Sequence, residues 1–282
     1  MQLGIRLHDV EPGSVENRLA CVRSKGFSCV QLALYAAIKE YSVDNSALVP
    51  GYAMHLKRVF AKQDIDIAVL GCYKNLGNPN PEQLKKIQET YYAHIRFASL
   101  LGCGVVGTET GAVNEEYVYE PACHSEESLA VFIKNLKPVV KCAESFGVIM
   151  AIEPVWNHIV CNSKRALKVL QEIDSPNLQI IFDPVNLLSI ENYKEREEIF
   201  QEAIGLLGDY IAVVHLKDFS IVDNKITAVA AGEGLMDYKS VLSFLKKEKP
   251  FIQATLENTK PENAEKARCF LQDEYDKLAK VF

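Results

Sequence analysis

The sequence lacks any run of about eighteen apolar residues, the length that a membrane-spanning helix needs. Its first residues, MQLGIRLHDVEPG, also lack the basic segment and the long apolar core of a secretory signal. We therefore expect a cytoplasmic protein with no membrane partner.

An excess of positive charge is absent as well. The chain has 31 Lys and Arg against 37 Asp and Glu, a formal net charge of −6. An acidic chain has no general attraction for a phosphate backbone, so a nucleic-acid partner is not expected. A small soluble ligand remains open.

The eight cysteines form no CxxC pair and no disulfide framework of the kind found in small secreted domains. Several lie inside apolar runs, as in FSCVQLAL and VVKCAESFGV. A thiol in such a run packs as a small hydrophobic group, so reduced core cysteines are expected.

No low-complexity segment or Pro/Gly/Ser-rich linker divides the chain, and we expect residues 1–282 to form a single domain. What the chain does contain is a repeated unit, in which a short apolar run precedes an amphipathic, helix-like stretch. The short runs are QLGIRL, CVQLAL, IDIAVLG, CGVVGT, GVIMAIE, LQIIFD, YIAVVHL and FIQATLE, and the last amphipathic stretch is PENAEKARCFLQDEYDKLAKVF.

These runs are continuous rather than alternating and rich in Val, Ile and Leu, as is typical of parallel strands covered on both faces. Eight strand-then-helix units in series predict an α/β fold, a closed (β/α)₈ TIM barrel. A doubly wound open sheet is the alternative, but the first strand is not followed by the Gly-rich fingerprint of that fold.

Four consecutive expected strands end in groups that can bind a metal ion. IMAIE ends at Glu153, QIIFD at Asp183, AVVH at His215 and QATLE at Glu257. Because the carboxyl ends of barrel strands meet at one mouth, we expect these side chains to converge. Singly, each carboxylate is more often a helix cap or loop partner, and the histidine a core residue.

Together, however, three carboxylates in one cavity repel one another unless a cation compensates them. A divalent ion relieves that cost, and the imidazole completes a mixed oxygen and nitrogen ligand set. The absence of a thiolate favours Mn²⁺, with Mg²⁺, Co²⁺ or Zn²⁺ possible.

Such a site suits sugar chemistry. The ion can bind a carbonyl and a neighbouring hydroxyl, which makes the C–H between them more acidic and stabilises the resulting enediolate. Proton removal needs a base, and epimerisation needs an acid/base on each face of the substrate. Glu153 and Glu257 are the candidates for these two roles.

At these residues the sequence resembles the xylose isomerase-like TIM-barrel superfamily, in its sugar phosphate isomerase/epimerase group. The resemblance is carried by AIEPVWNH, PNLQIIFDPVNLL, VVHLKD, AAGEGLMDYKSVL and TLEN, and with the strand–helix repeat it covers essentially the whole chain. It implies that Glu153, Asp183, His215 and Glu257 bind the metal and that the two glutamates form the acid/base pair of ketose 3-epimerases. Barrels of this group often form homodimers or homotetramers.

Two positions depart from the ketose 3-epimerase pattern. Asn186 stands where many of those enzymes carry a His. Lys217 in HLKD stands where they carry an Arg that binds substrate oxygens. The HLKD and GEG segments resemble the sugar-phosphate epimerase and inosose dehydratase branches more closely. Lys217 is expected to meet either a substrate phosphate or a neighbouring carboxylate.

Three further residues are candidates for substrate contacts. Trp156 and His158 follow Glu153 in the expected loop, where the Trp either lines the pocket or only caps the barrel mouth. Glu109 ends the fourth strand in GTETG and either binds a substrate hydroxyl or shapes a loop. His8 and Tyr73 have a suitable location but no diagnostic pattern.

The function expected from these observations is a metal-dependent isomerase or epimerase of a sugar or sugar phosphate. An inosose-type dehydratase is the nearest alternative, since it starts from the same enediolate. A DNA-repair endonuclease of this fold would need a multi-zinc cluster with many more histidines than the six present. A sugar-binding protein without catalysis is a further alternative.

Overall fold

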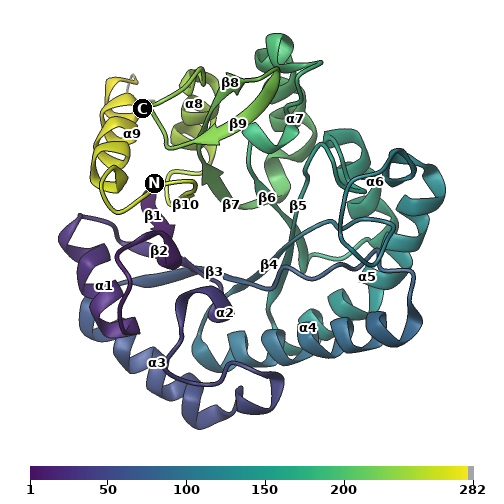
Figure 1. The fold of residues 1–282 in the computed structure, drawn as a ribbon, viewed down its shortest axis with the longest axis horizontal. Helices are drawn as coiled ribbons and strands as arrows, with labels where there is room; N and C mark the ends of the chain where they lie inside the picture. The colour runs from purple at the N-terminus through teal and green to yellow at the C-terminus, as the bar shows by residue number, and fades with distance from the viewer. Residues whose placement is uncertain (279–282) are drawn as a thin grey trace.

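The computed structural model describes residues 1–278 and contains a closed barrel of parallel strands in the order β1-β10-β7-β6-β5-β4-β3-β2 (Figure 1). The barrel strands are β1 (Gln2–Arg6), β2 (Cys29–Leu32), β3 (Asp66–Gly71), β4 (Val105–Glu109), β5 (Ile149–Glu153), β6 (Leu178–Phe182), β7 (Ile211–Leu216) and β10 (Gln253–Leu256). The predicted (β/α)₈ barrel is confirmed, and the alternative of an open sheet is wrong.

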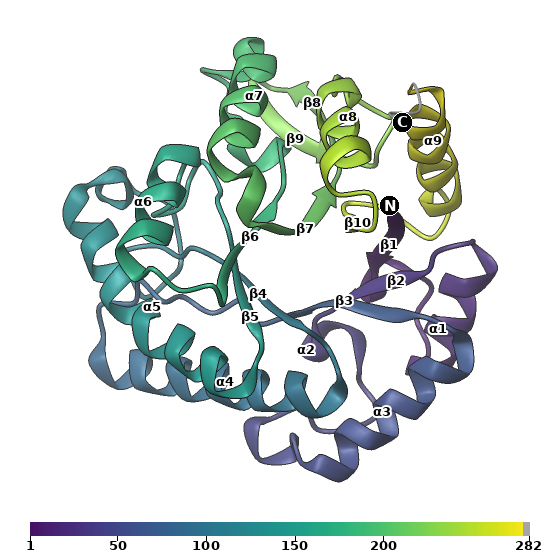
Figure 2. The same cartoon turned by 180° about the vertical axis from the view of Figure 1, so that it is seen from behind.

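Helices surround the barrel on the outside, as both views show (Figures 1 and 2). The helices that connect the barrel strands, together with the C-terminal helix, are α1 (Val15–Ser24), α3 (Pro50–Gln63), α4 (Pro81–Leu101), α5 (Glu126–Phe146), α6 (Ser163–Ile173), α7 (Arg196–Leu207), α8 (Lys239–Glu248) and α9 (Ala264–Lys277). A short helix, α2 (Leu34–Ala37), lies in the loop after β2. Residues 279–282 of the predicted last helix lie outside the described residues. No helix among residues 1–278 is both long and apolar enough to cross a membrane.

The inside of the barrel is filled by aliphatic side chains, which explains why its strands are apolar on both faces. Val69, Ala151, Ile181 and Val213 form a separate buried cluster there. Gly107 leaves room for this packing, because a Cβ atom at that position would lie 2.6 Å from side-chain atoms of both Val69 and Ile181. The small interior keeps the barrel closed and the strand ends at its mouth close together.

An antiparallel hairpin, which the sequence reading did not predict, follows β7 directly. Its strands are β8 (Asp218–Val222) and β9 (Lys225–Val229), joined through Asp223 and Asn224. Both turn residues have positive φ, 49° and 57°, as a two-residue type I′ turn requires. Since β7 ends at the barrel mouth, the hairpin stands beside that mouth (Figure 1).

Candidate metal centre

The four predicted ligand residues meet at one place. Glu153 is the last residue of β5, Asp183 follows β6, His215 lies near the end of β7, and Glu257 follows β10. All four are buried, with exposed fractions between 0 and 7 %, and one ligand atom from each lies within 4.8 Å of the others. The parallel barrel therefore brings together groups that are far apart in the sequence.

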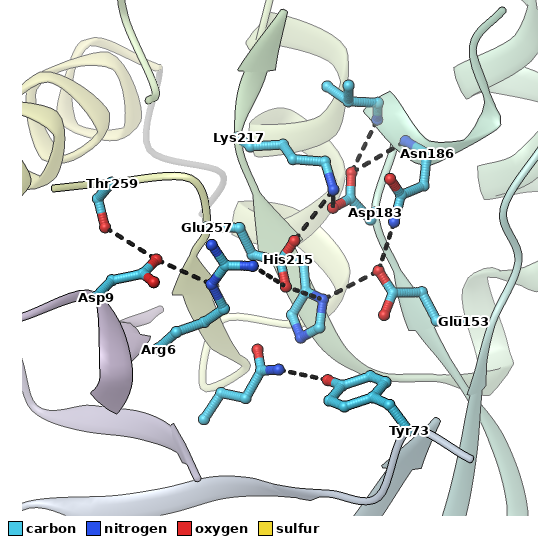
Figure 3. Close-up of polar contacts among 12 residues, drawn as sticks. Arg6, Asp9, Tyr73, Glu153, Asp183, Asn186, His215, Lys217, Glu257 and Thr259 are labelled. Atoms are coloured by element: carbon cyan, nitrogen blue, oxygen red, sulfur yellow. Dashed lines mark hydrogen bonds and ion pairs between the residues drawn. The ribbon is translucent and has the colours of Figure 1, made fainter. Parts of the chain in front are cut away.

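His215 lies between the two glutamates (Figure 3). Its Nδ1 is 3.1 Å from Oε1 of Glu153 and 3.2 Å from Oε1 of Glu257. Burial lowers the pKa of this imidazole, but the carboxylates of Glu153 and Glu257 outweigh burial and raise the pKa to about 9. Without a metal ion the ring therefore carries a proton that a bound ion would replace.

Asp183 is oriented by backbone N–H groups of the residues that follow it in the chain. Its Oδ1 accepts hydrogen bonds from the N–H groups of Val185 at 3.0 Å and Asn186 at 3.2 Å. The second oxygen, Oδ2, is thereby turned toward the cluster, where Nζ of Lys217 lies 2.8 Å away. Burial raises the pKa of Asp183 to about 6, although Lys217 acts in the opposite direction.

Lys217 also contacts a second member of the cluster, since its Nζ donates to Oε2 of Glu257 at 3.1 Å. Burial alone would raise the pKa of Glu257, but Lys217, His215 and Arg6 together lower it well below its usual value. In the structure Lys217 thus contacts two neighbouring carboxylates, one of the two kinds of partner expected from the sequence.

The charges of the cluster fit a divalent cation. With His215 neutral, as a metal ligand must be, three carboxylates face the single ammonium of Lys217, which leaves two negative charges to be compensated in a buried site. Uncompensated charges of this kind are costly to bury. Carboxylate oxygens and an imidazole nitrogen suit a hard or borderline ion. The residues present therefore suit a divalent metal ion.

A cavity of about 240 Å³ adjoins the cluster on the side of strands β1–β4; we call it the reaction cavity. Its lining residues are Arg6, His8, Gln31, Ala33, Tyr35, Tyr73, Glu109, Glu153 and Glu257. Three of the metal-site and substrate candidates, Glu109, Glu153 and Glu257, thus share one cavity. His8 and Tyr73, which carry no diagnostic pattern in the sequence, line it as well.

Two polar residues of the reaction cavity were missed in the sequence. Arg6, at the end of β1, donates to Oδ2 of Asp9 at 2.9 Å and approaches Oε1 of Glu257 at 3.8 Å. Gln31 in β2 donates to the hydroxyl of Tyr73. Both lie within the apolar runs QLGIRL and CVQLAL rather than at their ends, so inspection of the strand ends did not find them.

Glu109 is a carboxyl group with an unusual environment. Burial, followed by the charges of Glu153 and Glu257, raises its pKa to about 7. Tyr117, whose hydroxyl lies 3.3 Å away, donates to its Oε2. Without a metal ion, a large fraction of Glu109 is therefore protonated at neutral pH and able to donate a hydrogen bond inside the cavity.

The remaining substrate candidates lie in different places. Asn186 contacts the cluster, because its amide nitrogen donates to Oε1 of Glu153 at 2.7 Å. His158 packs against the ring of Tyr117 at 5.3 Å between centroids and does not line the reaction cavity. Trp156 does not line it either, and instead borders a second cavity beside the hairpin.

Hydrogen bonds between the HLKD segment (215–218) and the loop that contains the GEG segment (232–234) hold Lys217 in place. The buried carboxylate of Asp218 accepts hydrogen bonds from the N–H groups of Phe219, Gly232 and Met236 at 2.8, 3.1 and 2.8 Å. The hydroxyl of Tyr238 donates to the carbonyl of Lys217 at 2.8 Å. These contacts hold the backbone of Lys217 and the loop after the hairpin in place.

Comparison with known proteins agrees with this architecture. Residues 19–273 match the family model of the xylose isomerase-like TIM barrel, and the chain belongs to this family. The family resemblance recognised in the sequence is confirmed. No protein of curated function matches the sequence.

Solved structures share the fold at low sequence identity. A D-tagatose 3-epimerase-like protein is 20% identical, covers 98% of this chain and 97% of its own, and has a TM-score of 0.76. The IOLI protein, solved with a bound zinc atom, is 19% identical over 100% of both chains with a TM-score of 0.76. The 3-keto-D-glucoside 4-epimerase YcjR from E. coli is 15% identical, covers 97% of this chain and 99% of its own, and has a TM-score of 0.75.

Proposed function

We propose that this protein is a divalent-metal-dependent isomerase or epimerase that acts on a sugar by abstracting a proton next to a carbonyl group. The observation that carries the proposal is the buried set of Glu153, Asp183, His215 and Glu257, with ligand atoms within 4.8 Å of one another, bordering a polar cavity. The structural relatives named above include a D-tagatose 3-epimerase-like protein and a 3-keto-D-glucoside 4-epimerase, which supports the same class of reaction.

The bound ion supplies positive charge that makes the C–H beside a carbonyl more acidic and stabilises the enediolate. Mn²⁺ is the ion we propose, because the donor set holds three carboxylates, one imidazole and no thiolate. The zinc atom in the IOLI protein makes Zn²⁺ the first alternative to test.

We assign proton transfer to the two glutamates. Both line the reaction cavity, and they approach Nδ1 of His215 from different strands, at 3.1 and 3.2 Å. In our proposal Glu257 removes the proton and Glu153 returns one to the opposite face of the same carbon, which inverts that centre. Asn186 keeps Glu153 in position through its hydrogen bond.

The other polar groups of the cavity bind and orient the sugar. Arg6 and Gln31 present hydrogen-bond donors from the ends of β1 and β2, and protonated Glu109 adds one from β4. Lys217 holds Asp183 and Glu257 by ion pairs, so we assign it the task of fixing these two carboxylates rather than of binding a phosphate.

A dehydratase is the second candidate, and Glu109 is the observation that favours it. A buried carboxyl group with a pKa of about 7 is able to protonate a departing hydroxyl at neutral pH. Product analysis separates the two reactions, because a dehydratase yields an unsaturated or dicarbonyl product and an epimerase yields only a stereoisomer.

The test is exchange of substrate hydrogen for deuterium. Metal-loaded protein is incubated in D₂O with a panel of ketoses, ketose phosphates and inososes, in parallel with Mn²⁺, Mg²⁺, Co²⁺ and Zn²⁺. We expect deuterium at one carbon only when metal is present, with a loss of about 10²-fold or more in Glu257→Gln and Glu153→Gln.

The matched control is Glu126→Gln, a change of the same chemistry at an exposed glutamate on α5 that keeps full activity. Metal content is measured for each variant, so that a lost base is distinguished from a lost ion. Full exchange in a metal-loaded Glu257→Gln protein would overturn the role of Glu257. Absence of exchange with every sugar and metal would point to a binding protein.

A further inference from the structure

The metal cluster is bordered on its other side by a second and larger cavity, of about 480 Å³. We call it the hairpin cavity, because the inner face of β9 forms one wall and the segments after β5 and β6 form the others. Its lining includes Trp156, Val185, Ile190, Lys217, Ile226 and Ala228. Nothing in the reaction proposed above uses this space.

Two side chains, Lys217 and Asn186, lie between the hairpin cavity and the reacting centre, and Figure 3 shows both in contact with the cluster. Lys217 lines the hairpin cavity and contacts Glu257, which lines the reaction cavity. Asn186 lines the hairpin cavity and contacts Glu153, which also lines the reaction cavity. A ligand bound at the cluster is therefore separated from each cavity by no more than the thickness of one side chain.

The sizes of the cavities indicate that the ligand extends beyond the smaller one. Pockets for small molecules usually measure about 300–1,000 Å³, and the reaction cavity, at about 240 Å³, falls below that range. It accommodates the reacting sugar, whereas the hairpin cavity offers twice as much room for a group attached to it.

The walls of the hairpin cavity select the chemistry of that group. Apolar atoms form most of the surface, with branched aliphatic side chains from three segments among the lining residues, and the indole of Trp156, which is 36 % exposed, lines it too. The backbone N–H of Trp156 donates to the carbonyl of Asn186 at 2.7 Å, and its ring lies 5.6 Å from that of Tyr119. An aromatic ring held in this way offers a flat apolar face to a ligand.

Two charged side chains, Lys217 and Lys225, line the hairpin cavity. The ammonium of Lys217 is already paired with Asp183 and Glu257. Lys225 also lines the cavity, but its side chain is exposed to solvent. The other polar lining groups are neutral, namely the amides of Asn157, Asn186 and Asn224 and the hydroxyl of Ser189. Such a surface suits an apolar ring with a few hydrogen-bonding edges.

We propose that the hairpin cavity is a second subsite, which takes an apolar group about the size of a phenyl ring carried by the sugar at the metal centre. The natural substrate is then a substituted sugar, an aryl glycoside or a close analogue, rather than a free ketose. This inference rests on the proposed function only in placing a sugar at the cluster.

The sole tryptophan of the chain makes the test direct, since Trp156 reports on the hairpin cavity by its fluorescence. Metal-loaded protein is titrated with phenyl β-D-glucopyranoside, methyl β-D-glucopyranoside and cellobiose. We expect the phenyl glucoside to change Trp156 emission and to bind at least tenfold more tightly than the methyl glucoside. Equal affinities of these two, or equal tightening by cellobiose, would overturn the proposal.

A matched pair of variants locates the effect. Ala228 faces the cavity on β9, whereas Thr227 next to it is exposed and points to the opposite face of the strand. Ala228→Phe fills the cavity and is expected to abolish the preference for the phenyl glucoside, while Thr227→Phe keeps it. If Ala228→Phe does not fold, Ile226→Ser, which removes apolar wall, is expected to reduce the preference at least threefold.

Failure of this inference is distinguishable from failure of the proposed function. Trp156 fluorescence reports on the subsite, and deuterium exchange reports on the metal centre. A phenyl preference that depends on Ala228 supports the subsite even if no sugar exchanges deuterium. Exchange with a free ketose, combined with equal affinities for the two glucosides, refutes the subsite alone.

Discussion

Nζ of Lys217 lies 2.8 Å from Oδ2 of Asp183 and forms a buried ion pair between two neighbouring strand ends. The same ammonium reaches Glu257, so one lysine holds two of the four ligand residues. The lysine is in turn held by the loop that Asp218 and Tyr238 fix. The metal centre is thus built on the HLKD segment as much as on the ligands themselves.

The first prediction concerns this lysine. Lys217→Met removes the cation that compensates the buried carboxylates and should lower the free energy of unfolding of the metal-free protein by about 3 kcal/mol. Added divalent metal should restore more stability to this variant than to the wild type. Urea unfolding with chelator and with metal measures both effects.

The control for the lysine is an exposed pair. Nζ of Lys168 lies 2.6 Å from Oε2 of Glu126, and both side chains are largely exposed. Lys168→Met should leave the free energy of unfolding nearly unchanged, with no dependence on metal, because an exposed ion pair is screened by solvent. Equal losses in the two variants would show that Lys217 does not carry the charge balance that we assign to it.

The second prediction concerns Glu109, to which we assign the role of a hydrogen-bond donor to the sugar in the reaction cavity. Glu109→Gln keeps a donor and should change KM by about threefold or less. Glu109→Ala removes it and should raise KM by about tenfold, the effect of one lost hydrogen bond. Initial rates with the substrate found by deuterium exchange give the KM of each variant. A similar KM in Glu109→Gln and Glu109→Ala would contradict the assigned role.

The third prediction is a pH effect. Burial lowers the pKa of His158 to about 4, below its ordinary value of 6.5. The unfolded chain therefore takes up a proton at this residue before the folded protein does. The contribution of neutral His158 to stability is fully present above pH 6.5 and is lost as the pH falls from 6.5 toward 4.

Comparison with His158→Asn isolates this group from the other titrating residues. Between pH 8 and pH 5, the wild type should lose about 1 kcal/mol of unfolding free energy relative to the variant, a value reduced for the partial exposure of the ring. Urea unfolding at three pH values supplies the difference. A difference that stays constant with pH would mean that His158 titrates normally in the folded state.

The fourth prediction concerns a glycine in the GEG segment. A Cβ atom at Gly234 would clash with the carbonyl oxygen of Phe219 and with Oδ1 of Asp218. Gly234→Ala should therefore displace the loop that holds Lys217, lower stability by about 2 kcal/mol and reduce turnover. Thermal unfolding and initial rates test the two parts of this expectation.

Gly205 provides the matched substitution. It lies inside α7, with no atom within 4 Å of the Cβ that alanine would add. Gly205→Ala should raise stability by about 0.5–1 kcal/mol, because alanine favours the helix. If Gly234→Ala behaves like Gly205→Ala, the loop around Asp218 tolerates a side chain and the argument fails.

Much of the fold follows from the sequence, because parallel strands buried on both faces are continuous apolar runs. The predicted strand ends lie within two residues of the observed ones. The convergence of Glu153, Asp183, His215 and Glu257 was predicted for a similar reason: barrel topology brings strand ends together, and three buried carboxylates need a common cation.

What the sequence did not reveal depends on side-chain direction and on short elements. Arg6 and Gln31 look like ordinary strand residues until the barrel closes and turns them into the cavity. The β8–β9 hairpin has only a weak signal, the alternation of KITAV after the Asp223–Asn224 turn. The choice of Lys217 between a phosphate and a carboxylate required the position of its ammonium.

Because of the hairpin, the proposed metal site and the proposed subsite for a substituent are carried by different parts of the fold. The proposed metal ligands belong to barrel strands, whereas one wall of the larger cavity belongs to a hairpin between β7 and α8 that is paired only with itself within sheet structure. We therefore expect substitutions of the β9 residues that line this cavity to change which substituent is accepted while the metal ligands stay in place. In evolutionary terms, we expect a lineage with this chain to acquire new substrates through drift in these few residues, while Asp218 in β8 and the barrel strands preserve the chemistry.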